Sequence, residues 1–265
     1  MLSIGLGSQP VTECGIFGSN FAAEFDGGND RIVLPSELIS YWNEGTGASS
    51  TACNFSASLW VNVRDNDGGA SQNMWVIKND SSNNGFSMQF HRSALEFRAV
   101  AKINGTYKEA SYDESGFSLS DYVNQGWIHL VMTFEHNGST SSGDGEIKIY
   151  ANGVLKDTVA QDANWLDFDI DGSCIGSNES EDGGFADGYI DQLAMFNTTL
   201  SQLQVTAIYN GGVMTDLTTI AGDGKYNPST AGLVAYYQLE NNALDSGPNA
   251  YHGTINGATF TTSQP

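Results

Sequence analysis

The amino-acid sequence predicts an all-β protein, and three observations lead to that prediction. Short apolar segments recur along the 265 residues, and turns rich in Gly, Asn, Asp and Ser separate them. The chain has 31 glycines but only 5 prolines, and it shows no long helical periodicity. Hydrophobic residues make up 40% of the chain, which is enough to bury a core. Many short strands of this kind are typical of a β-sandwich or a β-barrel.

The first strands are expected in the N-terminal half of the chain. Residues 21–34 indicate a hairpin, with two strands around a Gly-Gly turn. Residues 40–53 read as a polar loop. In residues 55–63 apolar and polar side chains alternate, which predicts a half-buried antiparallel strand. A meander is expected to follow, with strands at 74–77, 86–90 and 95–100.

Later in the chain, residues 127–134 alternate in the same way, and residues 146–155 contain the strongest hairpin signal. Its Asn-Gly turn supplies the positive φ angles that a type I′ turn needs. A further strand at 188–197 carries one acid, Asp191, among apolar neighbours. Such an acid must be neutralised by a partner, by hydrogen bonds or by a metal ion.

One short helix is expected after this strand, towards the C-terminal end. Ser201 and Gln204 have the spacing of a capping box, so the helix should begin at Ser201. The residues expected to form its buried face are Leu200, Leu203, Ala207 and Ile208.

Charge and hydropathy exclude two classes of partner. The chain has 31 acidic residues against 10 Lys and Arg, a formal net charge of −21. Phosphate binding needs clustered cations, so nucleic acid is not an expected partner. No apolar segment approaches the length of a membrane span, so no membrane partner is expected either. The first residues lack the pattern of a secretory signal, and we expect synthesis in a cytoplasm.

Six motifs occur in order along the chain: Phe25-Asp26-Gly27-Gly28-Asn29-Asp30, Phe55-Ser56-Ala57-Ser58-Leu59-Trp60-Val61, Trp127-Ile128-His129-Leu130-Val131, Ile149-Tyr150-Ala151-Asn152-Gly153, Ile175-Gly176 and Gly188-Tyr189-Ile190-Asp191. In this order and spacing they resemble the laminin-G-like, concanavalin A-like jelly-roll superfamily. The resemblance implies a two-sheet antiparallel jelly-roll sandwich, with one of the sheets curved and concave.

The resemblance also divides the chain. Residues 233–260 look like the family's first strand and loop, which normally precede the Phe-Asp-Gly segment. We therefore expect an N-terminal arm (1–20), a sandwich (21–212), a connection (213–232) and a C-terminal segment (233–265) that completes the sandwich. This segment either folds back as the circularly permuted first strand of its own chain or completes a neighbouring subunit. The second arrangement would build a homo-oligomer, through the arm or the C-terminal strand.

A calcium site is the first candidate site, and the resemblance implies it. Asp26 and Asp245 lie in segments that the family places close to Asp191. Calcium takes about six to eight oxygen ligands, and three carboxylates that meet at one corner would repel each other without a cation. In the alternative, backbone N–H groups satisfy Asp191, and the other two are turn acids.

Ligand-binding candidates come from loops and from the rare cations. Trp42 lies in an expected loop and offers a flat face on which a pyranose can pack. Arg92 and Arg98 stand out in so acidic a chain, and either they bind an acidic glycan or they balance local charge. No enzymatic activity is expected, because no strand carries the paired carboxylates of a glycosidase and the dispersed histidines form no triad or zinc set.

Two functions remain open at this point. The first is a structural protein of a virion, such as a capsid decoration or a tail or fibre protein of a phage, made in the host cytoplasm and bound to other virion proteins. The second is a calcium-dependent carbohydrate-binding adhesion module of a bacterial surface protein, acting outside the cell on a glycan. The resemblance to laminin-G-like domains in phage structural proteins favours the first, but a fold does not determine a function.

Overall fold

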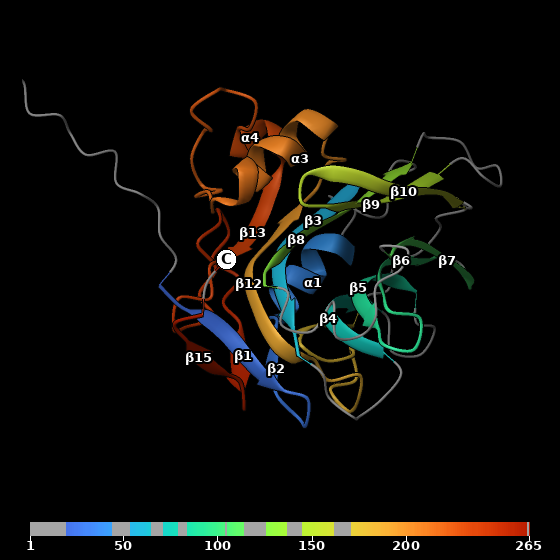
Figure 1. Cartoon of the computed structure of the whole chain (residues 1–265), viewed down its shortest axis with the longest axis vertical. Coiled ribbons are helices and arrows are strands. Elements are labelled where there is room, and N and C mark those ends of the chain that lie inside the picture. Colours follow the sequence, from blue (N-terminus) through green and yellow to red (C-terminus); the bar gives the residue numbers. More distant parts are fainter. Residues whose placement is uncertain are drawn as a thin grey trace, which may run out of the picture.

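The structure is a computed structural model that describes residues 20–43, 54–64, 71–78, 84–103, 105–113, 126–136, 145–161, 171–263 and 265. In this part of the chain two antiparallel β-sheets pack face to face (Figure 1). The predicted two-sheet jelly-roll sandwich is confirmed. No helix in the described ranges is long and apolar enough to cross a membrane.

Sheet A has eight strands. Its order is β10 (Val154–Gln161), β9 (Gly145–Ala151), β8 (Ile128–His136), β3 (Phe55–Val63), β12 (Asp187–Phe196), β1 (Ala22–Asp26) and β15 (Thr259–Thr261), and β13 (Leu233–Tyr237) pairs with β12. The expected Asn-Gly hairpin joins β9 to β10, and Asn152 and Gly153 have φ angles of 50° and 77°. Both angles are positive, as a type I′ turn requires.

Sheet B has seven strands. Its order is β14 (Thr254–Asn256), β2 (Arg31–Val33), β11 (Gly172–Ile175), β4 (Ser71–Lys78), β5 (Gly85–His91), β6 (Glu96–Ile103) and β7 (Thr106–Tyr112). The strands from β4 to β7 form the expected meander, in which each strand pairs with the next.

The hairpin expected at residues 21–34 is wrong, because its two strands belong to different sheets. β1 pairs with β12 and β15 in sheet A, whereas β2 pairs with β11 and β14 in sheet B. Residues 27–30 therefore cross from one sheet to the other, and the N–H of Gly27 donates to the carbonyl oxygen of Ala186. A local turn signal indicates only that the chain changes direction. Which strands pair is determined by β11 and β12, which are distant in the sequence.

The polar loop expected at residues 40–53 is also corrected at its start. Helix α1 spans Ser36–Asn43, directly after Pro35, and Glu37 supplies an acid in its first turn. An acid in this place favours a helix through the helix dipole. The side chain of Leu38 is buried in the core between the sheets. Two turns of helix are too short to show a clear period in the sequence.

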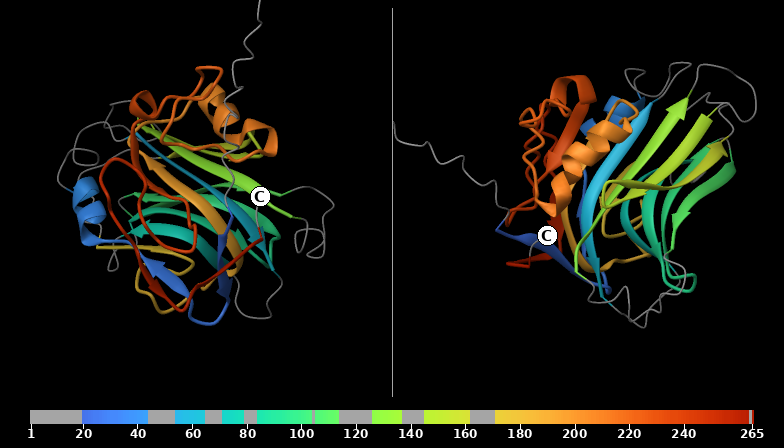
Figure 2. Two further views of the ribbon diagram at one scale, coloured as in Figure 1. Left: turned by 90° about the vertical axis from the view of Figure 1, so that its left-hand side faces the viewer. Right: turned by 45° about the horizontal axis from the view of Figure 1, so that its top comes forward.

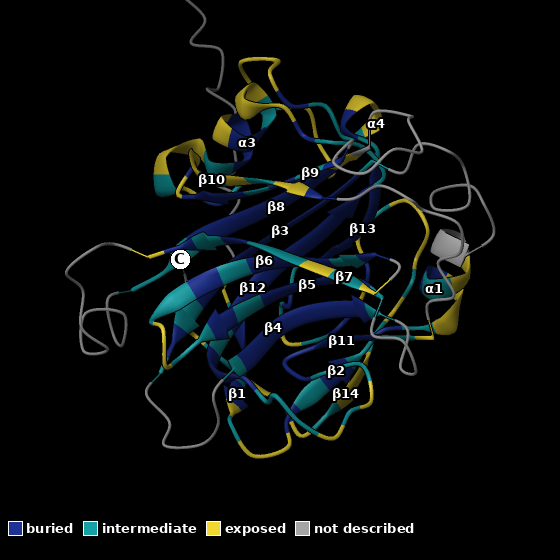
Figure 3. Cartoon of the chain, turned by 90° about the vertical axis from the view of Figure 1, so that its right-hand side faces the viewer, coloured by how far each residue is buried: buried dark blue, intermediate teal, exposed yellow. Residues whose placement is uncertain are grey.

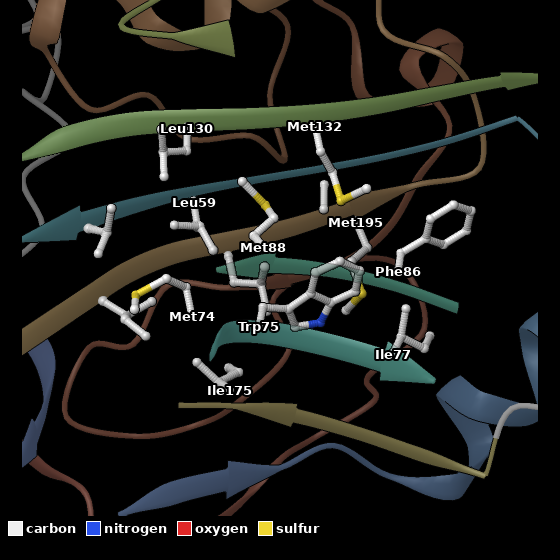
Figure 4. Close-up of a cluster of buried hydrophobic side chains, with 14 of the residues drawn as sticks. Leu59, Met74, Trp75, Ile77, Phe86, Met88, Leu130, Met132, Ile175 and Met195 are labelled. Carbon is white, nitrogen blue, oxygen red and sulfur yellow. The ribbon is translucent and has the colours of Figure 1, made fainter. Parts of the chain in front are cut away.

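The main core lies between the inner faces of the two sheets. Figure 4 shows side chains of β3, β8 and β12 meeting those of β4, β5 and β11. The residues labelled there are Leu59, Met74, Trp75, Ile77, Phe86, Met88, Leu130, Met132, Ile175 and Met195. The alternation in β3 places Phe55, Ala57 and Leu59 in this core, as predicted.

β3 is not half-buried, however, since its outer face is covered as well (Figure 3). A second apolar cluster covers part of the outer face of sheet A. It joins Phe196 of β12 and Tyr236 of β13 to Val205 and Ile208 of helix α3 (Gln202–Tyr209). Figure 2 shows α3 along the outer side of this sheet. Ser56 and Ser58, on the outer side of β3, are therefore buried too.

Helix α3 has the predicted capping box, in which Ser201 Oγ accepts the N–H of Gln204 and the Gln204 side chain accepts the N–H of Ser201. Its predicted buried face is wrong at Leu203, which is 63% exposed, while Val205 is buried instead. The 3₁₀ helix η1 (Asn210–Gly212) ends the segment, and a short helix, α4 (Pro228–Ala231), precedes β13.

The C-terminal segment adds strands to both sheets of its own chain. β13 pairs with the second half of β12, β15 pairs with β1, and β14 pairs with β2. The first half of β12 pairs with β1 at the same edge. β12 is thus flanked on one side by β3 and on the other by two strands from opposite ends of the chain. An exchange of this segment between subunits stays a prediction.

Candidate functional site

The three acids of the predicted calcium site are best described one at a time. Asp191 marks the point where β12 changes partner, because Ile190 pairs with Ala23 of β1 and Leu193 pairs with Tyr237 of β13. The register with β3 shifts here, and Gln192 has a φ of 51°. Asp191 is fully buried at this bulge, and its Oδ1 accepts the N–H of Gln192 at 2.9 Å.

Asp245 organises the loop after β13. Its Oδ1 accepts the backbone N–H groups of Tyr236 and Gly247, both at 2.7 Å, and its Oδ2 accepts that of Tyr251 at 2.8 Å. Such charge-assisted bonds satisfy a buried carboxylate without a metal ion. Asp245 therefore ties the C-terminal segment to itself.

Asp26 lies at the exposed end of β1, and its Oδ1 accepts the N–H of Gly28 at 2.8 Å. Within the described ranges, no group of three His, Cys, Asp or Glu side chains is arranged to hold a metal ion. The backbone bonds of Asp26, Asp191 and Asp245 fit the alternative in which N–H groups satisfy the acids. Calcium binding stays a prediction, and calorimetric titration of the chelator-treated protein tests it.

The predicted ligand-binding residues lie in three different elements: β6, the turn after β5, and α1. Arg98 lies on the outer face of sheet B, where it forms ion pairs with Glu96 and with Glu109, the second at 3.0 Å. Its side chain is 16% exposed, so the contacts of Arg98 fit charge balance better than a free anion site. Arg92 lies in the turn after β5, and its carbonyl oxygen accepts the N–H of Leu95. Trp42 lies in the last turn of α1, and its side chain is outside the described part of the structure.

A different surface has the features of a binding site. Trp127, Asn62, Tyr189 and Glu24 lie side by side on the outer face of sheet A, across β8, β3, β12 and β1. Tyr189 pairs with Asn62 and with Glu24, and Trp127 directly precedes Ile128, the partner of Val61. We call these four residues and Arg64 the aromatic shelf.

The two rings of the shelf lie close together and are partly exposed. The ring centroids of Trp127 and Tyr189 are 6.3 Å apart, at an angle of 43°. The Arg64 guanidinium lies over the Tyr189 ring, 4.9 Å from its centroid. A cation over an aromatic face is attracted by the ring quadrupole, which holds the Tyr189 ring in place.

The neighbouring outward positions on β3 and β8 are buried, whereas the rings of the shelf are partly exposed. Trp60 and His129 follow Asn62 and Trp127 on the outer face, and both are buried. The Tyr209 ring at the end of α3 covers them, with centroids 5.9 Å from each ring. Helix α3 therefore closes one half of this face of sheet A and leaves the shelf at the other half.

Acidic side chains hold Arg64 at the edge of the shelf. Its Nε donates to Asp187 Oδ1 at 2.9 Å, its Nη1 to Glu24 Oε1 at 2.6 Å, and its Nη2 to the Phe25 carbonyl oxygen at 2.6 Å. Burial by itself lowers the pKa of Arg64, but the hydrogen bond to Glu24 and the charge of Asp187 raise that pKa above its ordinary value. The guanidinium is thus charged and fixed in direction.

Gly188 is the residue that allows Tyr189 to reach this position. Its φ is 139°, and a Cβ atom there would lie 2.2 Å from the carbonyl oxygen of Asn62. Only glycine lets β12 approach β3 so closely.

Sequence reasoning missed the shelf as a site, although the Trp127 and Gly188-Tyr189 motifs supported the family resemblance. A signal was present, because Trp127 and Tyr189 alternate with core residues in predicted strands and therefore face outwards. Arg64 is in addition one of only 10 cations in the chain.

A family model described as the concanavalin A-like lectin/glucanases superfamily (Laminin_G_3) matches residues 26–206. The match covers more than half of the chain, and the protein belongs to this family. The resemblance inferred from the six motifs is therefore confirmed. Comparison with curated proteins gave no match.

Solved structures show the same fold at low identity. A proposed carbohydrate-binding protein from Bacteroides ovatus aligns with a TM-score of 0.55 and 16% identity, over 93% of this chain and 60% of that one. The binding domain of botulinum neurotoxin serotype G gives 0.52 and 15%, over 89% and 56%. A heptameric pentraxin from Limulus polyphemus gives 0.50 and 14%, over 90% and 96%. The chain thus spans less than two thirds of the first two, and these likenesses show the fold alone.

Proposed function

We propose that this domain is a non-enzymatic recognition module that binds carbohydrate on the aromatic shelf. The pair of partly exposed rings, Trp127 and Tyr189, carries the proposal. Flat aromatic side chains bury large apolar areas at low conformational cost, and the apolar face of a pyranose packs well on them. Polar groups that fix the orientation of a sugar stand beside the rings, on Asn62, Glu24 and Arg64.

The comparisons support the class of ligand. The family description names lectins, and the Bacteroides structure is described as that of a proposed carbohydrate-binding protein. Since these likenesses are distant, carbohydrate binding by this chain is an inference from its own shelf.

The same family description also names glucanases, but the arrangement of the shelf favours binding over hydrolysis. Glycosidases need one carboxyl group as an acid and a second as a base or nucleophile. The two carboxylates of the shelf region, Glu24 and Asp187, both accept hydrogen bonds from Arg64. Both carboxylates are therefore engaged by the same guanidinium, which leaves neither side chain free to face a glycosidic bond as the acid or the base.

The virion role and virion location, the partnership with other virion proteins and the formation of homo-oligomers stay predictions from the sequence. Calcium dependence and attachment to a bacterial surface also stay predictions. None of the structures described above is a virion protein, and the shelf is a binding surface in either setting.

A glycan array and fluorescence titration test the proposal. We expect Trp127→Ala and Tyr189→Ala each to weaken binding of the best glycan by about tenfold or more, because each removes a stacking face. Tyr107→Ala is the matched control, since Tyr107 is 49% exposed but belongs to sheet B. Circular dichroism shows whether each variant is folded. Glycan binding that survives both shelf substitutions, or an array without any bound glycan, would contradict the proposal.

A further inference from the structure

We infer that the aromatic shelf selects uncharged sugars over acidic ones, and that Glu24 sets this selectivity. The inference rests on the proposed function and adds the chemical class of the ligand. It starts from Arg64, the one cation of the shelf, which would at first sight attract an acidic sugar.

The hydrogen bonds of Arg64 argue against the binding of an acidic sugar. A guanidinium has about five N–H bonds, and in Arg64 each nitrogen already donates to an oxygen of the protein, on Asp187, Glu24 or Phe25. A bidentate grip on an incoming carboxylate needs two parallel N–H bonds from one edge of the guanidinium. Nε and Nη1 already serve carboxylates of the protein and Nη2 serves a carbonyl oxygen, so an incoming carboxylate would share every guanidinium nitrogen that it contacts with an acceptor of the protein. At most one further N–H on each of Nη1 and Nη2 remains for a ligand. Single N–H groups suit the hydroxyl oxygens of a neutral sugar.

The charge of the shelf leads to the same conclusion. Glu24 and Asp187 face one Arg64, so the three side chains carry a formal charge of −1. The whole chain carries −21, so the long-range field also repels anions. A uronate or sialate bound over Tyr189 would place its carboxylate beside two others of the same sign.

Glu24 is the carboxylate that a ligand meets first. Its side chain is 30% exposed, whereas that of Asp187 is 11% exposed. Glu24 also pairs in register with Tyr189, so it stands next to the ring on which the sugar is proposed to stack. In Glu24→Gln the amide oxygen can still accept the N–H of Arg64 Nη1, and the substitution changes the charge with little change of shape.

The test uses pairs of oligosaccharides that differ only in a carboxylate, neutral against uronic acid, with the full-length protein. We expect the wild-type protein to bind the acidic member about tenfold more weakly than the neutral one, and Glu24→Gln to narrow this gap by about fivefold, as expected for removal of one exposed charge. The gap should also shrink when salt rises from about 0.02 M to about 0.5 M, because salt screens exposed charges. If Glu24 had only a structural role, Glu24→Gln would change the affinity for the neutral and the acidic oligosaccharide by the same factor.

The matched control is Glu109→Gln, which makes the same change of charge beside Arg98 on sheet B and should leave the ratio unaltered. Equal binding of neutral and acidic sugars by the wild-type protein would overturn the selectivity and leave the proposed function intact. An unchanged ratio in Glu24→Gln would overturn the role of Glu24. If neither Trp127→Ala nor Tyr189→Ala weakens binding, or if no sugar binds, the proposed function itself fails.

Discussion

His129 Nε2 lies 2.8 Å from Ser58 Oγ, and the two side chains are 2% and 1% exposed on the outer face of sheet A. A serine hydrogen-bonded to a histidine looks like a nucleophile with its base. Here the Trp60 ring lies 4.9 Å from the His129 ring, and Tyr209 of α3 covers both. Both residues are buried, so the serine is not open to a substrate. The His129 ring packs instead against Tyr209 and contributes to the contact between α3 and the sheet.

The burial of His129 predicts a loss of stability in acid. Desolvation lowers the pKa of His129 from 6.5 to about 3, so the unfolded chain takes up this proton at a higher pH than the folded one. The contribution is fully present above pH 6.5 and is lost as the pH falls from there towards 3. At pH 4.5 the expected loss is about 2–3 kcal/mol.

Urea unfolding at pH 7 and at pH 4.5 measures this effect. His129→Gln removes the titrating group, so its free energy of unfolding should fall less between the two pH values than that of the wild-type protein. His91→Gln is the control, because His91 lies at the end of β5 and is partly exposed. Equal pH dependence in the wild-type protein and His129→Gln would refute the prediction.

The close approach at Gly188 predicts a severe effect of one added methyl group. In Gly188→Ala the new Cβ would lie 2.2 Å from the Asn62 carbonyl oxygen, at a φ of 139°. We expect the free energy of unfolding to fall by about 2–4 kcal/mol, because β12 and β3 must separate. Gly222→Ala, which adds a Cβ with nothing within 4 Å, should unfold like the wild-type protein. Thermal unfolding of both variants measures the effect. Equal unfolding midpoints for Gly188→Ala and Gly222→Ala would contradict the predicted clash with the Asn62 carbonyl oxygen.

The bonds of Asp245 predict that the C-terminal segment depends on one carboxylate. Asp245→Ala leaves the N–H groups of Tyr236, Gly247 and Tyr251 without their acceptor. The expected cost is about 3 kcal/mol, and amide exchange should rise first in β13 and its loop. Asp223→Asn, at an exposed acid paired with Lys225, should leave exchange in β13 unchanged. Uniform exchange across the chain in Asp245→Ala would show that this segment does not unfold separately.

The regular parts of the fold were readable from the sequence because their signals are local. The Asn-Gly turn at Asn152 and the capping box at Ser201 depend on neighbouring residues, and the structure confirms both. The alternation in β3 correctly identified the residues that face the core, but not the burial of the outer face. Errors occurred where distant parts decide. Residues 21–34 have the local pattern of a hairpin, but β1 pairs with β12 and β2 pairs with β11. Leu203 fits the helix period but faces solvent.

The candidate site was harder to predict than the fold for the same reason. Asp191, Asp26 and Asp245 stood out as single acids, but their backbone partners are invisible in the sequence. Trp127 and Tyr189 are more than 60 positions apart in the chain, and the pairing of three strands, β8, β3 and β12, brings their rings together. Which outward face stays open depends on where α3 lies, and no local pattern encodes that position.

The edge of β12 that β1 and β13 share has a consequence for folding during synthesis on the ribosome. β1 emerges before its two neighbours, β12 and β15, which lie more than 150 residues further along the chain. The nascent chain therefore keeps β1 without a strand partner until β12 has emerged. Closing so long a loop is entropically costly and slow. One partner of β1 and one partner of the second half of β12 thus come from the C-terminal segment, and β12 is also the strand that carries Tyr189.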